Sequence, residues 1–196
     1  MKRIAVSQRV DIFPERQETR DALDQRLTRL ITIVDGMVMP VPNSLSDAGK
    51  LDIWLSVLRP DAVILSGGND VGQFTERDTT ERQLLTYAQI HRLPVLGICR
   101  GMQMMGVWAG ATLKPVTGHV ANSHQLTGEI SGSANSFHNY ALVQCPAEFH
   151  VLARSEDGEI EAIRHNTLPW EGWMWHPERA PEFAKRDIER MKALFL

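Results

Sequence analysis

The sequence has few cysteines, no long apolar run and no large excess of either charge, and each absence removes a class of protein. Two cysteines in 196 residues cannot form the disulfide framework of a small secreted protein, so we expect free thiols and a cytoplasmic location. No apolar stretch reaches the roughly 20 residues of a membrane span, and the polar residues soon after Met1 argue against a secretory signal. A net charge of −3 with interspersed signs argues against nucleic acid as the main partner.

What the chain does contain is typical of a soluble globular protein. Apolar residues make up 43% and charged residues 23% of the sequence, which is near the average for folded domains. The sequence has no repeat, linker or low-complexity segment, so we expect residues 1–196 to form one domain.

Short apolar runs alternate with amphipathic segments along the first half of the chain. The runs predict strands at residues 4–7, 37–41, 62–65 and 95–98. The amphipathic segments predict helices at residues 15–34, 51–58, 79–91 and 100–109, and a closing helix at 184–195. Residues 113–175 are richer in β-branched residues, glycines and turns, which indicates further strands and loops. The alternation predicts an α/β fold with a parallel sheet and helices on both faces.

The segment Pro94–Gly106, PVLGICRGMQMMG, carries the most information in the sequence. A buried strand ends at Cys99, and helical spacing begins directly after it. Gly97 and Gly101 flank the cysteine in a G-x-C-x-G pattern, the cysteine form of a nucleophile elbow, whose turn leaves no room for side chains. The elbow places the sulfur at a helix N-terminus, where the dipole favours the reactive thiolate. Local sequence alone is equally consistent with a small buried cysteine that has no chemistry.

A histidine and a glutamate follow an apolar strand near the end of the chain. Trp173–Glu178 reads WMWHPE, and residues two apart in extended chain point to the same side. We expect Glu178 to hold one ring nitrogen of His176 and to leave the other free as a base toward Cys99. A surface histidine and a solvated carboxylate would explain each residue alone. Their occurrence together with the elbow indicates a Cys-His-Glu catalytic triad.

These groups come from distant parts of the sequence, but each follows a predicted strand. Arg9 follows the first strand, the pair Gly67 and Gly68 follows the third, and Cys99 and His176 each end a later one. In sheets of this type, ligands bind beyond the carboxyl ends of the strands. The sequence therefore predicts a single site at that edge.

Ordered motifs from Ile64 to Glu178 resemble those of the class I glutamine amidotransferase-like superfamily. They are LSGGND, ERDTTE, LPVLGICRGMQMM, GATL, the pair His119 and His124, NSFHN, GEIEAIRH and WMWHPE. The ERDTTE and GEIEAI segments resemble more narrowly the γ-glutamyl-γ-aminobutyrate hydrolase type of γ-glutamyl hydrolase, a peptidase C26-like branch. The resemblance implies a flavodoxin-like three-layer αβα sandwich with a central, mostly parallel sheet. It also implies a thiol hydrolase that cleaves γ-glutamyl amides without a cofactor.

The resemblance assigns roles to further residues. It implies an oxyanion hole formed by the backbone N–H groups of Gly68 and Arg100, and such a donor is typically worth about 3 kcal/mol. It also implies that the backbone of the segment after Asn135 receives the glutamyl carboxylate. The implied substrate-binding residues are Gln103, Ser136, Phe137, His138 and Asn139.

Two departures from the family pattern concern the leaving group. The family usually has two histidines and a glutamine where this chain has His138-Asn139-Tyr140, and the chain is short for the hydrolase branch. Compact members with an NSFHN motif resemble γ-glutamyl-CDP-amidate hydrolases, which act in making phosphoramidate-modified capsule. A diphosphate requires charge-assisted donors. The candidate donors are Arg9, Arg16, Arg20 and Arg100.

Several alternatives stay open. The chain is also consistent with a glutaminase subunit that passes ammonia to a synthase partner, with a γ-glutamyl-GABA hydrolase of polyamine catabolism, and with a binding module that has no activity. A homodimer is a further option, and no membrane contact is expected. His119 and His124 suggest a metal, but no third or fourth ligand stands near them in the sequence, so we expect no metal site.

Overall fold

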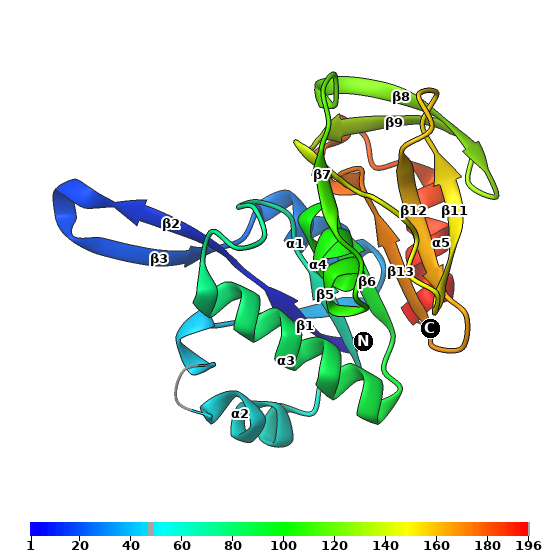
Figure 1. Ribbon diagram of the computed structural model, residues 1–196. Helices are drawn as coiled ribbons and strands as arrows, with labels where there is room; N and C mark the ends of the chain where they lie inside the picture. The colour runs from blue at the N-terminus through cyan, green and yellow to red at the C-terminus, as the bar shows by residue number, and fades with distance from the viewer. Residues whose placement is uncertain (47–48, 196) are drawn as a thin grey trace.

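A mixed sheet runs through the centre of the part of the chain described by the computed structural model, residues 1–46 and 49–195 (Figure 1). Its strands, in spatial order, are β4 (Gly36–Val41), β1 (Lys2–Ser7), β5 (Ala62–Leu65), β6 (Val95–Ile98), β13 (Trp170–Trp173), β12 (Ile160–His165), β11 (Phe149–Arg154), β8 (Val120–Gly128) and β9 (Gly132–Phe137). The first five strands run parallel to one another, and the others continue the sheet in antiparallel pairs. The parallel half carries the elbow.

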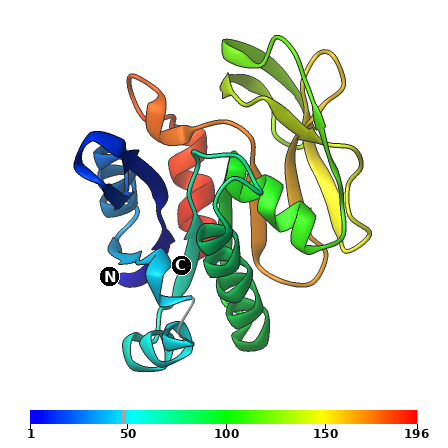
Figure 2. The ribbon, with the colours of Figure 1, turned by 60° about the vertical axis from the view of Figure 1, so that its left-hand side comes forward.

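Helices cover both faces of the parallel half. Helices α1 (Gln25–Ile33) and α5 (Lys185–Phe195) pack on one face, and α2 (Lys50–Leu58), α3 (Thr75–His91) and α4 (Arg100–Trp108) pack on the other. Alternate residues of each strand enter opposite cores: Ile64 packs with α1, whereas Val63 and Leu65 pack with α2 and α3. Figure 2 gives a second view of these layers. The expected three-layer α/β architecture is confirmed.

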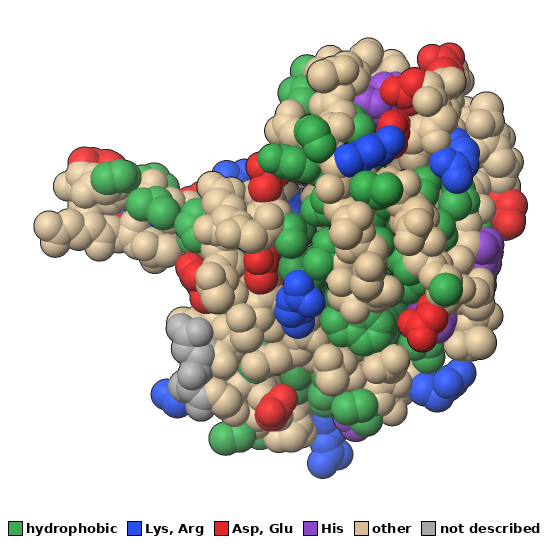
Figure 3. Space-filling view, viewed as in Figure 1, with side chains coloured by type: hydrophobic (Ala, Val, Ile, Leu, Met, Phe, Trp, Pro, Cys, Tyr) green, Lys and Arg blue, Asp and Glu red, His purple; other side chains and the backbone are tan. Residues whose placement is uncertain are grey.

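One predicted helix is wrong. Residues 9–22 form an antiparallel hairpin, β2 (Arg9–Phe13) and β3 (Glu18–Ala22), joined by the short 3₁₀ turn η1 (Pro14–Arg16). The helix expected over residues 15–34 begins only at Gln25, because the Asp24 carboxylate accepts a hydrogen bond from the backbone N–H of Arg26 at 2.8 Å and caps it there. The hairpin projects away from the body of the molecule (Figures 1 and 3).

The remaining elements agree with the sequence within a turn. Helix α3 starts at Thr75 rather than residue 79, and β4 tolerates Pro40 because it lies at the edge of the sheet. Residues 113–175 form strands, as expected; they include a small second sheet of β7 (Leu113–Pro115) and β10 (Tyr140–Leu142). Two further 3₁₀ turns are η2 (Asn43–Leu45) and η3 (Pro177–Arg179).

No described helix has both the length and the apolar character needed to cross a bilayer. The expectation of a single domain over residues 1–196 stays a prediction.

Candidate active site

The carboxyl ends of the parallel strands meet at one edge of the sheet, and the predicted site residues gather there. Cys99 follows β6, His176 follows β13, and Gly68 follows β5. All three line one cavity of about 340 Å³. The fold therefore brings these three residues together at one edge of the sheet, as the sequence predicts.

Cys99 occupies a strained turn between β6 and α4. Its backbone has φ 51° and ψ −106°, a combination that a non-glycine residue rarely adopts and that costs of order 1–3 kcal/mol. The glycines beside it have no room for a side chain: a Cβ at Gly97 would lie 2.7 Å from the backbone carbon of Gly101, and a Cβ at Gly101 would meet the carbonyl of Leu65. The turn is thus the elbow that the sequence predicts.

Burial and neighbouring groups act in opposite directions on the pKa of the Cys99 thiol. Burial raises its pKa to about 12, although the Arg100 N–H and the charge of Arg179 act in the opposite direction. Burial therefore opposes the helix dipole, which favours the thiolate, and the expectation of a thiolate stays a prediction. A neutral thiol can act as a nucleophile only if a base accepts its proton.

The His176 imidazole lines the same cavity as Cys99 and pairs with a carboxylate. Its Nδ1 lies 2.6 Å from Oε1 of Glu178, and both side chains are buried. Its ring packs directly against Gly67, where a Cβ would lie 2.5 Å from Cε1 and 3.3 Å from Nε2. Across the part of the chain that the structure describes, no hydrogen bond joins His176 to Cys99, although both line the same cavity. Catalytic contacts of this kind often tighten only when substrate binds.

Asn135 fixes the backbone of His176, a role that sequence reasoning missed. Its side-chain oxygen accepts a hydrogen bond from the His176 N–H at 2.9 Å, and its Nδ2 donates to the His176 carbonyl at 2.8 Å. The asparagine begins the NSFHN motif. In the sequence, the signal for this role was an amide side chain that can both donate and accept a hydrogen bond.

Comparisons with known proteins assign the family. A family model described as "Glutamine amidotransferase class-I" matches residues 21–194. The chain belongs to the class I glutamine amidotransferase family. Members of this family hydrolyse amides, which is consistent with a thiol and an imidazole that line one cavity and a carboxylate that pairs with the imidazole.

Curated relatives of this amidotransferase chain differ in activity. A γ-glutamyl-CDP-amidate hydrolase from Campylobacter jejuni is 33% identical over 140 residues, which cover 68% of this chain and 69% of the relative. A glutamine-hydrolyzing GMP synthase subunit from Methanothrix thermoacetophila is 34% identical over 61% of this chain and 68% of the relative. Component 2 of an anthranilate synthase from Thermococcus kodakarensis is 30% identical over 81% of this chain and 83% of the relative.

Solved structures share the amidotransferase fold. A protein described as a GMP synthase subunit from Thermoplasma acidophilum superposes with a TM-score of 0.73 at 19% identity, covering 100% of this chain and 92% of that one. A glutamine amidotransferase from Thermotoga maritima gives a TM-score of 0.68 at 19% identity, covering 98% of this chain and 83% of that one. At these identities the likeness establishes the fold alone.

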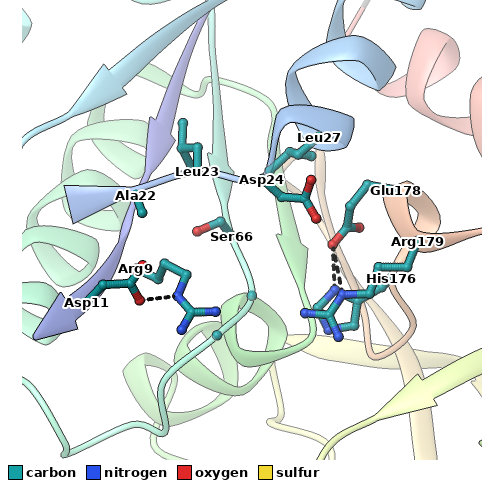
Figure 4. Close-up of a pocket in the computed structure, with 12 residues that line it drawn as sticks. Arg9, Asp11, Ala22, Leu23, Asp24, Leu27, Ser66, His176, Glu178 and Arg179 are labelled. Carbon is teal, nitrogen blue, oxygen red and sulfur yellow. Dashed lines mark hydrogen bonds and ion pairs between the residues drawn. The ribbon is translucent and has the colours of Figure 1, made fainter. Parts of the chain in front are cut away.

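The amidotransferase site has a second cavity beside the first. It has a volume of about 270 Å³ and shares Gly68, His176 and Arg179 with the cavity that holds Cys99. Figure 4 shows Arg9 on one side of this second cavity and the His176–Glu178 pair on the other. Leu23 and Leu27 add an apolar wall.

Most predicted substrate-binding residues line the Cys99 cavity. They are Gln103, Phe137, His138 and Asn139. Gln103 Nε2 donates to the Tyr140 carbonyl at 2.8 Å, which ties the elbow helix to this segment. Ser136 is fully buried and donates to the His119 carbonyl at 2.7 Å, so its hydroxyl does not line either cavity. Arg9 lines the second cavity instead, where its Nε donates to Asp11 at 2.8 Å.

Three of the four candidate phosphate-binding arginines are wrongly placed for that role. The Arg100 guanidinium is buried and paired with Asp78 and Glu81, so it is not available to a phosphate. Arg16 and Arg20 lie on the projecting hairpin, where Arg20 pairs with Glu18, and neither lines a cavity of the site.

Arg179 is the cationic residue that the sequence did not reveal. It lines both cavities and lies 4.8 Å over the ring of Phe137. Its position directly after Glu178 was the available signal. Together with Arg9, it gives the second cavity two guanidinium groups.

Arg77 shapes the loop that carries Gly68. Its guanidinium is fully buried and donates to the carbonyls of Ser66 at 2.8 Å and Gly67 at 2.9 Å, and also to that of Gly68. In a trans peptide the N–H points opposite to the preceding carbonyl. The Gly68 N–H therefore points away from Arg77, which leaves it available to an anion in the cavity that Gly68 lines.

Proposed function

We propose that this protein is a thiol hydrolase that cleaves a γ-glutamyl amide through a thioester and releases glutamate. The observation that carries the proposal is the cavity that Cys99 and His176 both line, with the buried Glu178 carboxylate 2.6 Å behind the His176 ring. A nucleophile, a base and a carboxylate that orients the base are the groups that acyl transfer requires.

In the proposed reaction, Cys99 Sγ attacks the γ-amide carbon while its proton passes to Nε2 of His176. The tetrahedral oxyanion is stabilised by the N–H groups of Gly68 and Arg100. His176 then protonates the departing nitrogen, the C–N bond breaks, and a thioester remains on Cys99. A water molecule gives a proton to His176 and attacks the thioester, and glutamate and the free thiol result.

The two cavities suggest how the substrate is divided. The glutamyl group fits the Cys99 cavity, because Gln103 and the segment Phe137–Asn139 line it. The leaving nitrogen must lie beside His176, so the leaving group extends into the second cavity, which His176 shares. Asp11, Asp24 and Glu178 also line this cavity, and Arg9 pairs with Asp11 at 2.8 Å. The remaining N–H groups of Arg9 and Arg179 are donors for an anionic leaving group.

We propose γ-glutamyl-CDP-amidate as the substrate, which would place the enzyme in capsule phosphoramidate synthesis. The two arginines supply charge-assisted donors for a diphosphate, and Leu23 and Leu27 offer an apolar surface to a nucleoside. The similarity to the Campylobacter hydrolase supports the same choice.

A glutaminase subunit is the second candidate. The GMP synthase and anthranilate synthase subunits match at comparable identity, and one of them covers 81% of the chain. Such a subunit would use glutamine, whose leaving group is ammonia, and would leave the arginines of the second cavity without a role.

The test compares kcat/KM for γ-glutamyl-CDP-amidate, γ-glutamyl-GABA and glutamine, in the wild type and in Arg9→Ala. We expect the CDP conjugate to be the best substrate and to be the one most slowed by Arg9→Ala. Arg20→Ala, on the hairpin, is the matched control and should leave the order unchanged. A preference for glutamine or γ-glutamyl-GABA would refute the substrate assignment, and equal slowing of all three would refute the role of Arg9.

A further inference from the structure

Three histidines and a buried glutamate meet behind the segment 136–139, called the substrate segment below. The sequence showed no third ligand near His119 and His124, but the structure brings one to them. His119 lies just before β8, His124 lies on β8, His138 follows β9, and Glu161 lies on β12. One metal-binding atom of each of His119, His124 and Glu161 lies within 4.8 Å of the others. The third ligand that the sequence did not show is Glu161, which is distant in the chain but adjacent in the fold.

Hydrogen bonds to groups outside the cluster determine which ring nitrogens of the histidines face its centre. His119 Nε2 lies 2.9 Å from Oδ2 of Asp157, an acceptor, so this nitrogen carries the proton and Nδ1 is a free lone pair. His138 Nδ1 lies 2.9 Å from the carbonyl oxygen of Tyr140, so Nδ1 carries the proton and Nε2 is a free lone pair. A carboxylate or carbonyl behind the ring is the usual partner of a metal-binding histidine.

The inward-facing atoms are all hydrogen-bond acceptors, so no hydrogen is available to join them. His119 Nδ1 lies 3.1 Å from His138 Nε2, and each lies 3.4 Å from Oε1 of Glu161. Oε1 of Glu161 and Nε2 of His124 are buried and have no hydrogen-bond partner among the residues that the structure describes. Converging lone pairs and a buried carboxylate repel each other unless a cation lies between them.

The spacing of three of these atoms fits a tetrahedral metal site. Zinc binds histidine nitrogen and carboxylate oxygen at about 2.0–2.2 Å in a tetrahedron, whose edges are then about 3.3 Å. The three distances of 3.1, 3.4 and 3.4 Å are close to three such edges. We propose that His119, His138 and Glu161, completed by His124, form a binding site for a divalent transition metal of the zinc class.

The metal would act on the substrate segment without touching the reacting atoms. His138 lines the Cys99 cavity, and the Ser136 hydroxyl donates to the His119 carbonyl at 2.7 Å. Coordination would therefore fix the segment Ser136–Asn139 between two metal ligands. This consequence rests on the proposed function, but metal binding itself does not.

The experiment removes metal from the purified full-length protein with a chelator and titrates it with Zn²⁺ and Co²⁺ in the absence of substrate. We expect one equivalent to bind and to raise the melting temperature, with Co²⁺ giving the visible absorption of a four-coordinate ion. Glu161→Gln should abolish that spectrum. Asp157→Asn should weaken binding about 10–100-fold, as loss of an outer carboxylate usually does.

Asp157→Asn keeps the proposal testable if Glu161→Gln fails to fold, because the Asp157 side chain is 55% exposed. His150→Ala removes an exposed histidine outside the cluster and should change nothing. The proposal is overturned if neither Zn²⁺ nor Co²⁺ binds saturably. That result would mean that a shared proton, rather than a metal, holds the histidines and Glu161 together. It is also overturned if folded Glu161→Gln still binds the metal, if Asp157→Asn binds it as tightly as the wild type, or if binding is lost in His150→Ala.

Removal of the metal should then raise KM for the γ-glutamyl substrate more than it lowers kcat. If binding is confirmed but no γ-glutamyl amide is cleaved, the metal site stands and the proposed function fails.

Discussion

Replacing Arg77 with lysine should impair catalysis while the fold survives. Arg77 is the residue that turns the carbonyls of Ser66, Gly67 and Gly68 to one side. It also pairs with buried Glu81 at 3.2 Å. Lysine preserves the positive charge beside Glu81, but a single ammonium cannot reproduce the planar fork that reaches three carbonyls. The loop would then be free to rotate the Gly68 N–H away from the oxyanion.

The magnitude follows from the value of one oxyanion donor. Loss of such a donor costs about 10²–10³ in kcat, or roughly 2.7–4 kcal/mol. Arg77 acts through the loop rather than directly, and the Arg100 donor remains. We therefore expect kcat to fall about 10–100-fold, which corresponds to about 1.4–2.7 kcal/mol, with little change in KM.

Steady-state kinetics on a γ-glutamyl amide, together with a thermal melt, measure this effect. Arg82→Lys is the matched control, since Arg82 is exposed on the same helix α3. An unchanged kcat with a lowered melting temperature would show that Arg77 serves stability alone. A rise in KM with an unchanged kcat would place its effect on substrate binding instead.

Three further outcomes follow from the same geometry. Neutral pH lies far below the pKa of about 12 of the Cys99 thiol, so the thiol should be protonated. Iodoacetamide should then alkylate Cys99 slowly, at a rate that keeps rising with pH, and a rate that levels off near neutral pH would contradict this. His176→Ala should abolish turnover as fully as loss of Cys99, whereas Glu178→Gln should be milder because it retains a polar contact to Nδ1; the reverse order in single-turnover rates would refute these roles. Gly67→Ala should lower kcat, because its Cβ would lie 2.5 Å from Cε1 of His176, and unchanged kinetics would show that the ring position is not critical.

The local patterns of the sequence predict the parallel half of the fold well. The elbow at Cys99 and the pairing of His176 with Glu178 depend on spacings of two residues, so the sequence alone specifies them. The strands β5 and β6 agree with their expected bounds because both are short, buried apolar runs. The hairpin β2–β3 escapes prediction because its strands are short and largely exposed, and β3, which reads ETRDA, has no apolar alternation.

The site features that the sequence does not predict depend on long-range contacts. Arg77 meets the oxyanion loop, and Glu161 meets His119, only through the folded sheet, so no spacing in the sequence reveals either partner. The burial that raises the pKa of Cys99 also escapes prediction, because the helix dipole can be inferred from the sequence whereas burial cannot. Arg100 looks free in the sequence for the same reason, since its partner Glu81 comes from another helix.

The central claim, a glutamyl thioester on Cys99, is tested most directly by intact-protein mass spectrometry after rapid acid quench of the enzyme with γ-glutamyl-CDP-amidate. The account predicts a mass increase of one glutamyl group in the wild type, located on the Cys99 peptide, removed by hydroxylamine and absent in Cys99→Ala. Release of glutamate by Cys99→Ala at the wild-type rate, or a glutamyl adduct on another residue, would contradict it.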